Sequence, residues 1–382
     1  MRKVAVLVDL ITYGGVQKTA IEEVKNLKKM GYSVKLLVLT RSGHDKNWDL
    51  PKNIPIEFLS DHLPKLFQIG FKLPYFKFLS TQLLLSSSAA PFFIKKENWD
   101  LVISHGSVAT LSALFLFYTK KIPYLFVLYD PMVYILEKVY KKTPLRYFFP
   151  FVIPLFFLLE RKMVQNAKTC FVISNVHTNF IKSSYKIVPT TLYLGIHIPK
   201  RTVKDMGNKI LFLGRFEKEK NIKVVFDLCK SLPHNKFIVA GKWTSIKDLI
   251  WFKSEIKKRN IIDRIELVES YQESDLPKIF EQSLCWVSPN FEAFSLSALE
   301  AASYGLPIVI NKGSGVTELF LNSKHGFFPK NKNQLEKAVK YIAANARRAH
   351  QMGINAAKIA HRYTWERHTK ILSTEIENSL EK

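Results

Sequence analysis

The sequence has few cysteines, and none stands in a spacing typical of a metal or redox site. The 382-residue chain contains Cys170, Cys229 and Cys285. Two of them fall in apolar strand patterns, so we expect buried, reduced thiols, as in a protein of the cytoplasmic side. No Asp-x-Asp pair occurs, so a divalent metal held by that device is not indicated and we predict no metal site. No signal peptide is visible either, because the first three residues lead directly into an apolar strand pattern.

Acidic side chains are scarce relative to basic ones. Lys and Arg number 57 against 32 Asp and Glu, a net charge of +25, and residues 1–205 alone contribute +16. Such an excess attracts an anionic partner: a phospholipid surface, a phosphorylated lipid acceptor or nucleic acid. No zinc finger, recognition helix or aromatic-plus-basic strand signature is present, so nucleic acid is the weaker candidate and we expect none as a partner.

No apolar run reaches the roughly 20 residues that a transmembrane helix needs, but two shorter runs stand out. Residues 147–159 lack charge, have basic flanks and contain Pro150 and Pro154, which would kink a helix. This run fits an interfacial helix, and equally a helix buried in the first domain. Residues 71–85 place lysines among aromatic residues, as in a half-buried core helix or a second membrane-facing segment. With the charge, both runs predict peripheral association with an anionic membrane.

Strand-like and helix-like segments alternate along the chain, and 47 % of the residues are hydrophobic, which predicts a packed α/β protein. Helices are expected over 15–30, 74–90, 107–118, 244–258 and 295–304, with others starting near 221 and 274. The connection from about 181 to 207 has few helix signals, so we place a domain boundary there. We predict two doubly wound parallel sheets, over residues 1–195 and 196–362, with ligands at the carboxyl ends of the strands.

Two glutamates eight positions apart, Glu292 and Glu300, mark a candidate ligand site. Glu292 lies in a loop after the apolar strand LCWVS, and Glu300 lies in a helix expected from about Ser295. A helix N-terminus offers unpaired N–H groups to a phosphate, whereas a carboxylate accepts hydrogen bonds from vicinal hydroxyls. A phosphate flanked by two sugars, as in a nucleotide sugar, fits both features. The alternative is a helix N-terminus that merely carries surface acids.

A second candidate segment is KILFLGRFEKEKN, residues 209–221. Its apolar strand ends at Gly214, followed by Arg215 and, five residues on, by Lys220 at the start of a helical pattern. A planar guanidinium and a point charge beside a glycine turn suit a diphosphate. The alternative is a solvated basic loop in a lysine-rich chain.

In this order and about 75 residues apart, the two segments resemble the donor site of the retaining family 4 glycosyltransferases (glycosyl transferases group 1) of the GT-B fold. The likeness extends along nearly the whole chain and is most specific in the second half. Gly14-Gly15 after the first strand, NAKTCFVISNVH at 166–177 and Gly305-Leu306-Pro307-Ile308 are similar to further family motifs. The closing YTWERHTKIL is similar to the family's final Trp-Glu helix.

The resemblance implies two Rossmann-like domains facing a central cleft, the first binding the acceptor and the second the donor. It implies that residues 363–382 form a helix crossing back to the first domain. The implied catalytic residues are Glu292, Arg215, Lys220 and Asp130. The implied donor-binding residues are Gly14, Gly15, Gly214, Arg215, Lys220, Gly241, Phe294, Ser295, Leu296 and Glu300. The implied acceptor-cleft residues are His105, Tyr129 and Asp130.

In this reading the donor is a UDP-, GDP- or ADP-linked sugar, and no other cofactor is required. Arg215 and Lys220 would stabilise charge on the leaving nucleoside diphosphate, doing the electrostatic work of a metal. Glu300 would hold the ribose hydroxyls and Glu292 the hydroxyls of the donor sugar. The sugar would move with retention at its anomeric carbon.

Two departures from the family pattern bear on the candidate site. Ala293 stands where glycine is commoner, which narrows the approach of the backbone to the sugar and leaves the donor sugar open. Tyr129-Asp130 stands where the family usually has His-Asp. Tyrosine is a poor base near neutral pH, so either Asp130 acts instead or the leaving phosphate deprotonates the acceptor. His105 at a strand's carboxyl end lines the acceptor cleft or serves a structural role.

We therefore predict a glycosyltransferase, peripheral on the cytoplasmic face of a membrane, that transfers a sugar to a carbohydrate or lipid-linked acceptor in surface-polysaccharide or lipopolysaccharide assembly. One alternative is another GT-B sugar-nucleotide enzyme, such as an epimerase. The other is a non-catalytic protein that binds a sugar nucleotide or nucleic acid.

Overall fold

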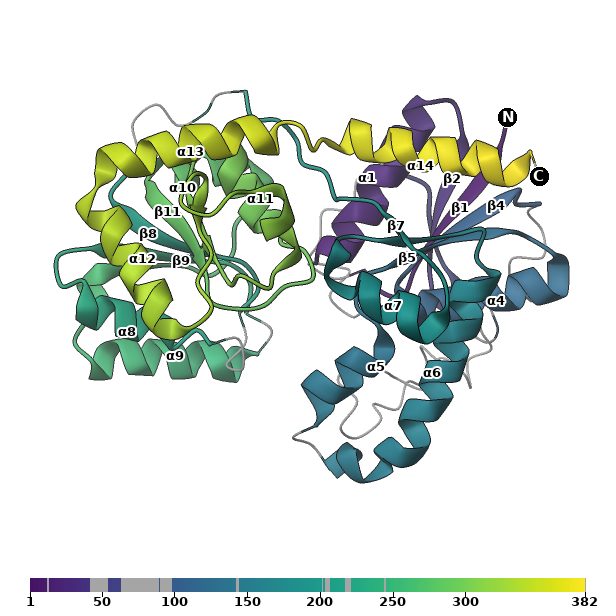
Figure 1. Ribbon diagram of the computed structural model, residues 1–382, viewed down its shortest axis with the longest axis horizontal. Helices are drawn as coiled ribbons and strands as arrows, with labels where there is room; N and C mark the ends of the chain where they lie inside the picture. The colour runs from purple at the N-terminus through teal and green to yellow at the C-terminus, as the bar shows by residue number, and fades with distance from the viewer. Residues whose placement is uncertain are drawn as a thin grey trace. The chain divides into compact units, whose positions relative to one another are not determined.

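The structure is a computed structural model in which the chain forms two compact α/β units (Figure 1). It describes residues 1–11, 14–41, 54–62, 89, 98–141, 144–200, 202, 207–216, 221–243 and 245–381. The first unit comprises residues 1–193 and 365–382, and the second comprises 194–364. The last helix, α14 (Trp365–Leu380), therefore belongs to the first unit although it follows the second in sequence.

The first unit is built on a parallel sheet of seven strands in the order β3-β2-β1-β4-β5-β6-β7. The strands are β1 (Lys3–Val8), β2 (Ser33–Val38), β3 (Ile56–Phe58), β4 (Leu101–His105), β5 (Tyr124–Leu128), β6 (Thr169–Val172) and β7 (Thr190–Thr191). Besides α14, the helices are α1 (Gly15–Lys29), α4 (Gly106–Lys120), α5 (Met132–Ile135), α6 (Phe149–Asn166) and α7 (Thr178–Tyr185). The side chains of residues 4–8 in β1 are fully buried, as expected for a parallel strand covered on both faces.

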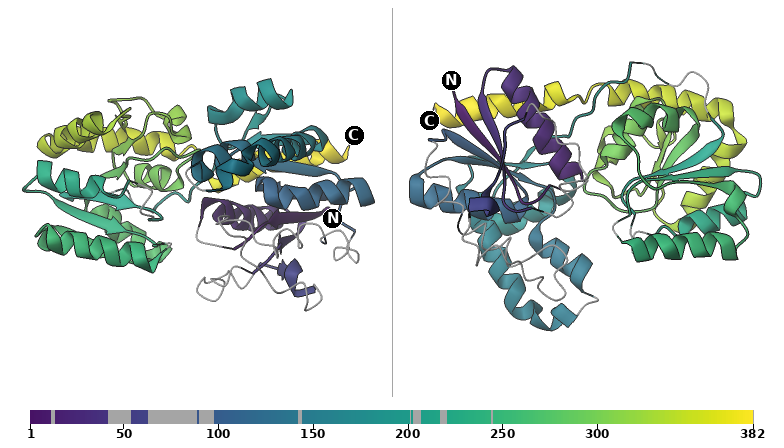
Figure 2. Two further views of the ribbon diagram at one scale, coloured as in Figure 1. Left: turned by 90° about the horizontal axis from the view of Figure 1, so that it is seen from below. Right: turned by 180° about the vertical axis from the view of Figure 1, so that it is seen from behind.

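The second unit has a parallel sheet of six strands in the order β10-β9-β8-β11-β12-β13. The strands are β8 (Lys209–Leu213), β9 (Lys236–Ala240), β10 (Ile265–Val268), β11 (Ser283–Ser288), β12 (Ile308–Ile310) and β13 (Gly326–Phe327). The helices are α8 (Val224–Ser231), α9 (Ile246–Lys258), α10 (Leu276–Glu281), α11 (Leu296–Ser303), α12 (Lys332–Ala344) and α13 (Ala346–Ala360). In Figures 1 and 2, α13 lies on one side of this sheet and α9 on the other.

The prediction of two parallel α/β domains is confirmed, while several element boundaries differ. The helix expected from 221 begins at Val224, because Asn221 adopts a left-handed φ of 48° and the chain turns first. The helix expected from 274 is a 3₁₀ turn over 273–275 followed by the short α10. Helix α7 extends to Tyr185, into the connection where few helix signals were seen. The run at 71–85 lies outside the described residues, as does all of the helix expected over 74–90 except residue 89.

Helix α6 carries the apolar run at 147–159. It stays helical through both prolines: Pro150 lies in the first turn, where its missing N–H has no helical partner, and Pro154 lies one turn further on. Its carboxyl-terminal half is anchored by the buried Glu160, which accepts hydrogen bonds from the Tyr185 hydroxyl at 2.5 Å and the Met132 backbone N–H at 3.0 Å. Among the described residues, no helix combines the length and apolar character needed to cross a bilayer.

Candidate functional site

In the first unit, three adjacent strands end in polar side chains at one edge of the sheet. Because β1, β4 and β5 are neighbours and parallel, the strand order brings together Asp9, His105 and Tyr129. His105 Nδ1 lies 3.0 Å from the Tyr129 hydroxyl oxygen. Asp9 accepts a hydrogen bond from the Leu10 backbone N–H at 2.8 Å, and burial raises the pKa of its carboxyl. Sequence reasoning missed Asp9, although it follows β1 just as Tyr129 follows β5.

Asp130, the residue after Tyr129, contacts a histidine from the segment that follows β6. Its Oδ1 lies 2.8 Å from Nε2 of His177, which is buried and has the ring of Tyr134 edge-on at 4.6 Å. His177 was quoted within a family motif but not proposed as a site residue. The predicted acceptor residues thus fall in two adjoining groups, one around His105 and one around Asp130.

The predicted glycine turn of the first unit opens helix α1. Gly14 is the N-cap residue, in an extended conformation, and no side chain caps the helix. The first turn also lacks acidic residues, so its N–H groups face no neighbouring carboxylate within the turn. The helix N-terminus that carries Gly14 and Gly15 follows β1, at the same sheet edge as Asp9. This arrangement can accept an anion.

In the second unit, the segments that follow β8 and β9 run side by side as a short extension of the sheet. The Gly214 N–H donates to the Ala240 carbonyl at 3.1 Å, and the Phe216 N–H donates to the Lys242 carbonyl at 2.9 Å. A Cβ atom on Gly241 would lie 1.7 Å from the Gly214 carbonyl oxygen, so the close approach of these two segments requires glycine. Phe216 is buried and Arg215 is exposed. Lys220 lies outside the described residues.

The loop before α11 holds Glu292 and is fixed to a second loop by backbone hydrogen bonds. The Glu292 N–H donates to Ser314 Oγ at 3.2 Å, and its carbonyl accepts from the Gly315 N–H at 3.0 Å. The hydroxyl of the buried Ser295 accepts a hydrogen bond from the Ala298 N–H at 3.4 Å and so caps α11. The carboxylate-bearing loop is therefore held at the N-terminus of α11.

The remaining predicted donor residues lie on and just before α11. The Phe294 side chain is buried, whereas Leu296, the first helical residue, and Glu300, one turn further on, are half-buried. Because β9, β8 and β11 are adjacent, the segments with Gly241, Arg215 and Glu292 leave the same edge of the sheet. The structure thus brings the described members of the predicted donor site that belong to the second unit to one sheet edge, whereas Gly14 and Gly15 belong to the first unit.

Lys242 belongs to the same sheet edge and was missed by sequence reasoning. Burial lowers the pKa of its ammonium group, and it directly follows Gly241 at the end of β9. The available signal was its position, since it stands after β9 as Arg215 stands after β8. Within the described ranges, no group of three or more His, Cys, Asp or Glu side chains is placed to hold a metal ion.

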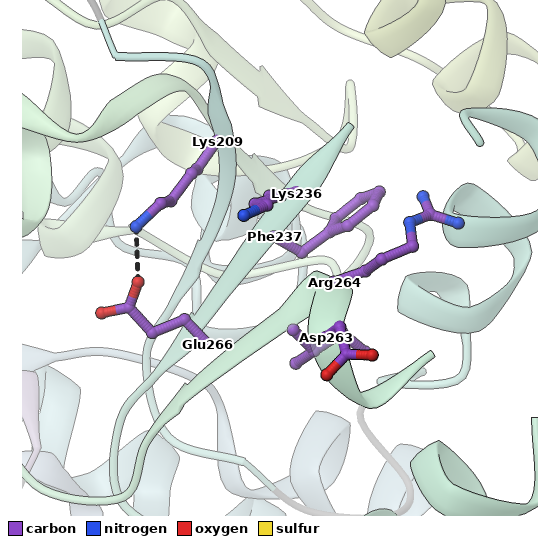
Figure 3. A pocket seen from close by; sticks show the side chains of 7 residues that line it. Lys209, Lys236, Phe237, Asp263, Arg264 and Glu266 are labelled. Carbon is purple, nitrogen blue, oxygen red and sulfur yellow. Dashed lines mark hydrogen bonds and ion pairs between the residues drawn. The ribbon is translucent and has the colours of Figure 1, made fainter. Parts of the chain in front are cut away.

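A pocket at the opposite edge of the second sheet has a different character (Figure 3). It is lined by residues at the amino ends of β8, β9 and β10, among them Lys209, Lys236 and Glu266. Lys209 Nζ pairs with Glu266 at 2.6 Å, and Arg264 donates to the carbonyls of residues 229, 232 and 235. Since ligands of such sheets bind at the carboxyl ends of the strands, we interpret these ion pairs as structural.

The chain is similar to several known proteins. Residues 196–359 match the family model described as glycosyl transferases group 1, and residues 13–198 match glycosyltransferase family 4. An uncharacterized glycosyltransferase of Methanocaldococcus jannaschii is 22 % identical over 352 residues, which are 90 % of each chain.

The sucrose-phosphate synthase of Thermosynechococcus elongatus has a similar structure, with a TM-score of 0.79 at 16 % identity over 98 % of both chains. Anabaena HepE in complex with UDP-glucose gives a TM-score of 0.75 at 14 % identity, over 99 % of this chain and all of that one. These likenesses confirm the GT-B fold predicted from the sequence.

Proposed function

The chain belongs to the family 4 glycosyltransferases (glycosyl transferases group 1), and we propose that it transfers a sugar, with retention, from a nucleoside-diphosphate donor to a carbohydrate or lipid-linked acceptor. The observation that carries this proposal is the common sheet edge of Arg215, Gly241, Glu292 and the capped N-terminus of α11. We assign the donor to this edge of the second unit. The acceptor is assigned to the strand ends of the first unit that bear Asp9, His105 and Tyr129.

Each proposed role follows from the chemistry of the side chain. The exposed guanidinium of Arg215 and the N–H groups of α11 would bind the diphosphate and stabilise the charge that grows on it as the glycosidic bond breaks. Lys220 is proposed to share this role. Glu300 on α11 would accept hydrogen bonds from ribose hydroxyls, and Glu292 from hydroxyls of the transferred sugar. The bound UDP-glucose of Anabaena HepE supports a uridine donor.

The fate of the acceptor proton is part of the proposal. The Tyr129 pKa lies well above its ordinary value, because of burial and then the nearby Glu23 charge, so the phenol is a poor base. Asp130 is already engaged with His177 at 2.8 Å. We therefore assign the acceptor proton to an oxygen of the leaving diphosphate, as the glycosidic bond to that oxygen breaks and the bond from C1 to the acceptor oxygen forms.

The donor assignment is tested by thermal unfolding with UDP, GDP, ADP, CMP and their sugar conjugates. A ligand at 100 times its dissociation constant stabilises by about 2.7 kcal/mol. We expect one nucleotide class to stabilise the parent and an Arg347→Ala control, whose arginine is exposed on α13, but not Arg215→Ala. Equal stabilisation of Arg215→Ala would refute the phosphate role. No stabilisation by any nucleotide would favour the non-catalytic alternative.

We also propose that the protein works at the surface of an anionic membrane, on the cytoplasmic side, in surface-polysaccharide or lipopolysaccharide assembly. The support is the outer face of α6. Its inner face packs on the core, yet Phe151, Leu155 and Leu158, spaced as one helical face, are 77, 57 and 57 % exposed. An apolar helix is normally buried on all sides. Figure 1 shows the N-terminal part of α6 extending away from the sheet of its unit.

Charge near this face favours anionic lipid over a protein partner. Within the described part of residues 136–162, the exposed charged side chains are Lys138, Lys141, Arg146, Lys162 and Glu137. Four cations against one anion, beside protruding phenylalanine and leucine side chains, suit the headgroup region of a bilayer. Each cation near such a surface contributes about 1 kcal/mol, so the attraction is strong and sensitive to salt.

Vesicle flotation tests the membrane proposal directly. We expect the parent to float with vesicles of anionic lipid and to stay behind with neutral ones, and the double variant Phe151→Ser, Leu155→Ser to lose binding. The matched control is Ile246→Ser, Ile250→Ser, which removes two isoleucines that are 74 and 62 % exposed on α9. Equal flotation of the α6 variant and the control would refute the assignment to α6.

A further inference from the structure

A buried glutamate of helix α1, Glu23, lies at the centre of a hydrogen-bond network that reaches the strand-end cluster of the first unit. One carboxylate oxygen lies 2.9 Å from Nε2 of His105, and the other lies 2.8 Å from Nε2 of His368 on α14. The three side chains are at most 1 % exposed. A charge so deeply buried is costly unless it is paired, so the network's hydrogens must be arranged to balance it.

The contacts of His368 determine its hydrogens. Its Nδ1 lies 2.9 Å from the carbonyl oxygen of Tyr193, and its Nε2 faces Glu23. Burial raises the pKa of Glu23, but the hydrogen bonds that both histidines donate to its carboxylate act against this and favour the ionised form. A carbonyl and a carboxylate only accept hydrogen bonds. His368 must therefore carry hydrogen on both nitrogens, and its positive charge balances Glu23.

The hydrogens of His105 follow from this pairing. Its Nε2 donates to Glu23, and a second hydrogen on Nδ1 would leave one carboxylate with two buried imidazolium rings. Asp9, also near His105, offsets this less than an ordinary carboxylate, because burial raises its pKa. His105 is therefore neutral, and its Nδ1 accepts the hydrogen of the Tyr129 hydroxyl at 3.0 Å. Thr19 also hydrogen-bonds the Tyr129 side chain, and with the Tyr129 hydrogen given to His105 it can do so only as a donor.

We propose that Glu23 and His368 are positioning residues that commit the Tyr129 hydrogen to His105. The Tyr129 hydroxyl can then offer a ligand only its oxygen, as a hydrogen-bond acceptor. The first unit therefore selects a sugar hydroxyl that donates a hydrogen bond at this point. The ligand class rests on the proposed function, whereas the hydrogen arrangement does not.

The same network includes residues close to the two points where the chain leaves the first unit and re-enters it. Tyr193 is the last residue of the first unit before the chain enters the second, and α14 begins at Trp365, where the chain returns. The Tyr193 carbonyl and the His368 ring are joined by one hydrogen bond. The position of Tyr129 therefore depends on α14 through the contact between Glu23 and His368.

Histidine nitrogen NMR tests the arrangement without any ligand. In protein labelled with ¹⁵N at histidine, two-bond ¹H–¹⁵N spectra distinguish imidazolium from the two neutral tautomers, and signals are assigned by their loss in His368→Gln and His105→Gln. At about pH 8, where a free imidazole is neutral, we expect His368 as imidazolium and His105 with hydrogen on Nε2 only. An imidazolium or an Nδ1–H tautomer at His105, or a neutral His368, would overturn the proposal.

Two variants sharpen this result. Glu23→Gln should make His368 neutral while leaving the His105 tautomer unchanged, because the amide oxygen still accepts from Nε2. The control Glu22→Gln alters a neighbouring buried acid that pairs with Lys25 at 2.6 Å and should change neither ring. An unchanged imidazolium signal of His368 in Glu23→Gln would contradict the pairing.

Kinetics test the role of the Tyr129 oxygen once a donor and acceptor are known. Loss of one accepted hydrogen bond in Tyr129→Phe should lower kcat/KM about tenfold. The control Glu22→Gln, which lies outside the network, should leave kcat/KM unchanged. Full activity of Tyr129→Phe would overturn the selection role. Absence of transfer by the parent would instead reject the proposed function and leave the NMR result standing.

Discussion

Removal of the Glu23 carboxylate has a stability cost that follows from the buried network. In Glu23→Ala the His368 imidazolium loses its partner in a site with no exposure, and breaking a buried ion pair costs about 3–5 kcal/mol. The pKa of the Glu23 carboxyl falls from 4.5 to about 2 on folding. This lowering acts in the same direction, so the ionised carboxylate stabilises the fold at neutral pH.

The assay is thermal or urea unfolding of Glu23→Ala, Glu23→Gln and the parent. For a unit of this size about 1 kcal/mol shifts the melting temperature by about 2–4 °C, so we expect the first unit of Glu23→Ala to melt about 6–20 °C lower. Glu23→Gln should lose less, because its amide fits between two histidines when His368 is neutral. A loss below about 1 kcal/mol in Glu23→Ala would refute the view that this carboxylate holds α1 and α14 together.

The pH dependence gives a second, sharper readout. A carboxyl whose pKa is lowered on folding stabilises the protein above its unfolded pKa, and this contribution disappears as the pH falls from 4.5 towards 2. The buried Asp9 and Glu160, whose pKa values are raised, act in the opposite sense. The difference between the parent and Glu23→Gln isolates the Glu23 contribution, and it should shrink over that range. A difference independent of pH would contradict the pairing.

Further predictions concern the second unit. Gly241→Ala should destabilise this unit by several kcal/mol and abolish nucleotide binding, because the new methyl group would lie 1.7 Å from the Gly214 carbonyl oxygen. A melting curve like that of the parent would contradict this close approach of the two segments. Ser295→Ala should cost about 1 kcal/mol by uncapping α11, whereas Ser295→Thr should lose little. Equal stability of Ser295→Ala and the parent in urea unfolding would show that the cap contributes nothing.

Local sequence patterns were sufficient to predict the donor side of the candidate site. At 210–215 a strand is followed by a glycine and a basic residue, and at 284–300 a strand is followed by a glutamate and a helix. Each of these patterns is short and continuous in sequence. Parallel pairing of β8 with β11 then brings the two segments to one sheet edge. The spacing of these residues was therefore enough to predict their common sheet edge, although the predicted start of α8 was wrong.

The Glu23 network could not be predicted in this way. Glu23 lies beside Glu22 and Lys25 in α1 and reads as part of a solvated helical face, yet it is fully buried. Its partners lie 82 and 345 residues further along the chain, so only the folded topology joins them. Asp9 and His177 were missed for a related reason. A lone polar residue after a strand gains meaning only when the neighbouring strands are known.

The outer face of α6 shows a third limit. The apolar run at 147–159 was recognised, but hydropathy alone could not distinguish an interfacial helix from a buried one. The structure shows that one face of the helix is buried and the other exposed. Phe151 and Leu155 are exposed, whereas Glu160 and Met163 further along the same helix are buried.

Hydrogen–deuterium exchange in the presence of the stabilising nucleotide sugar tests the donor assignment, because it locates the ligand on the chain. We expect slower exchange at the ends of β8 and β9, around Gly214 and Gly241, and in the 290–300 segment that leads into α11. Protection confined to the amino ends of β8, β9 and β10, around Lys209 and Glu266, or no protection near Arg215 and Glu292 despite bound ligand, would contradict it.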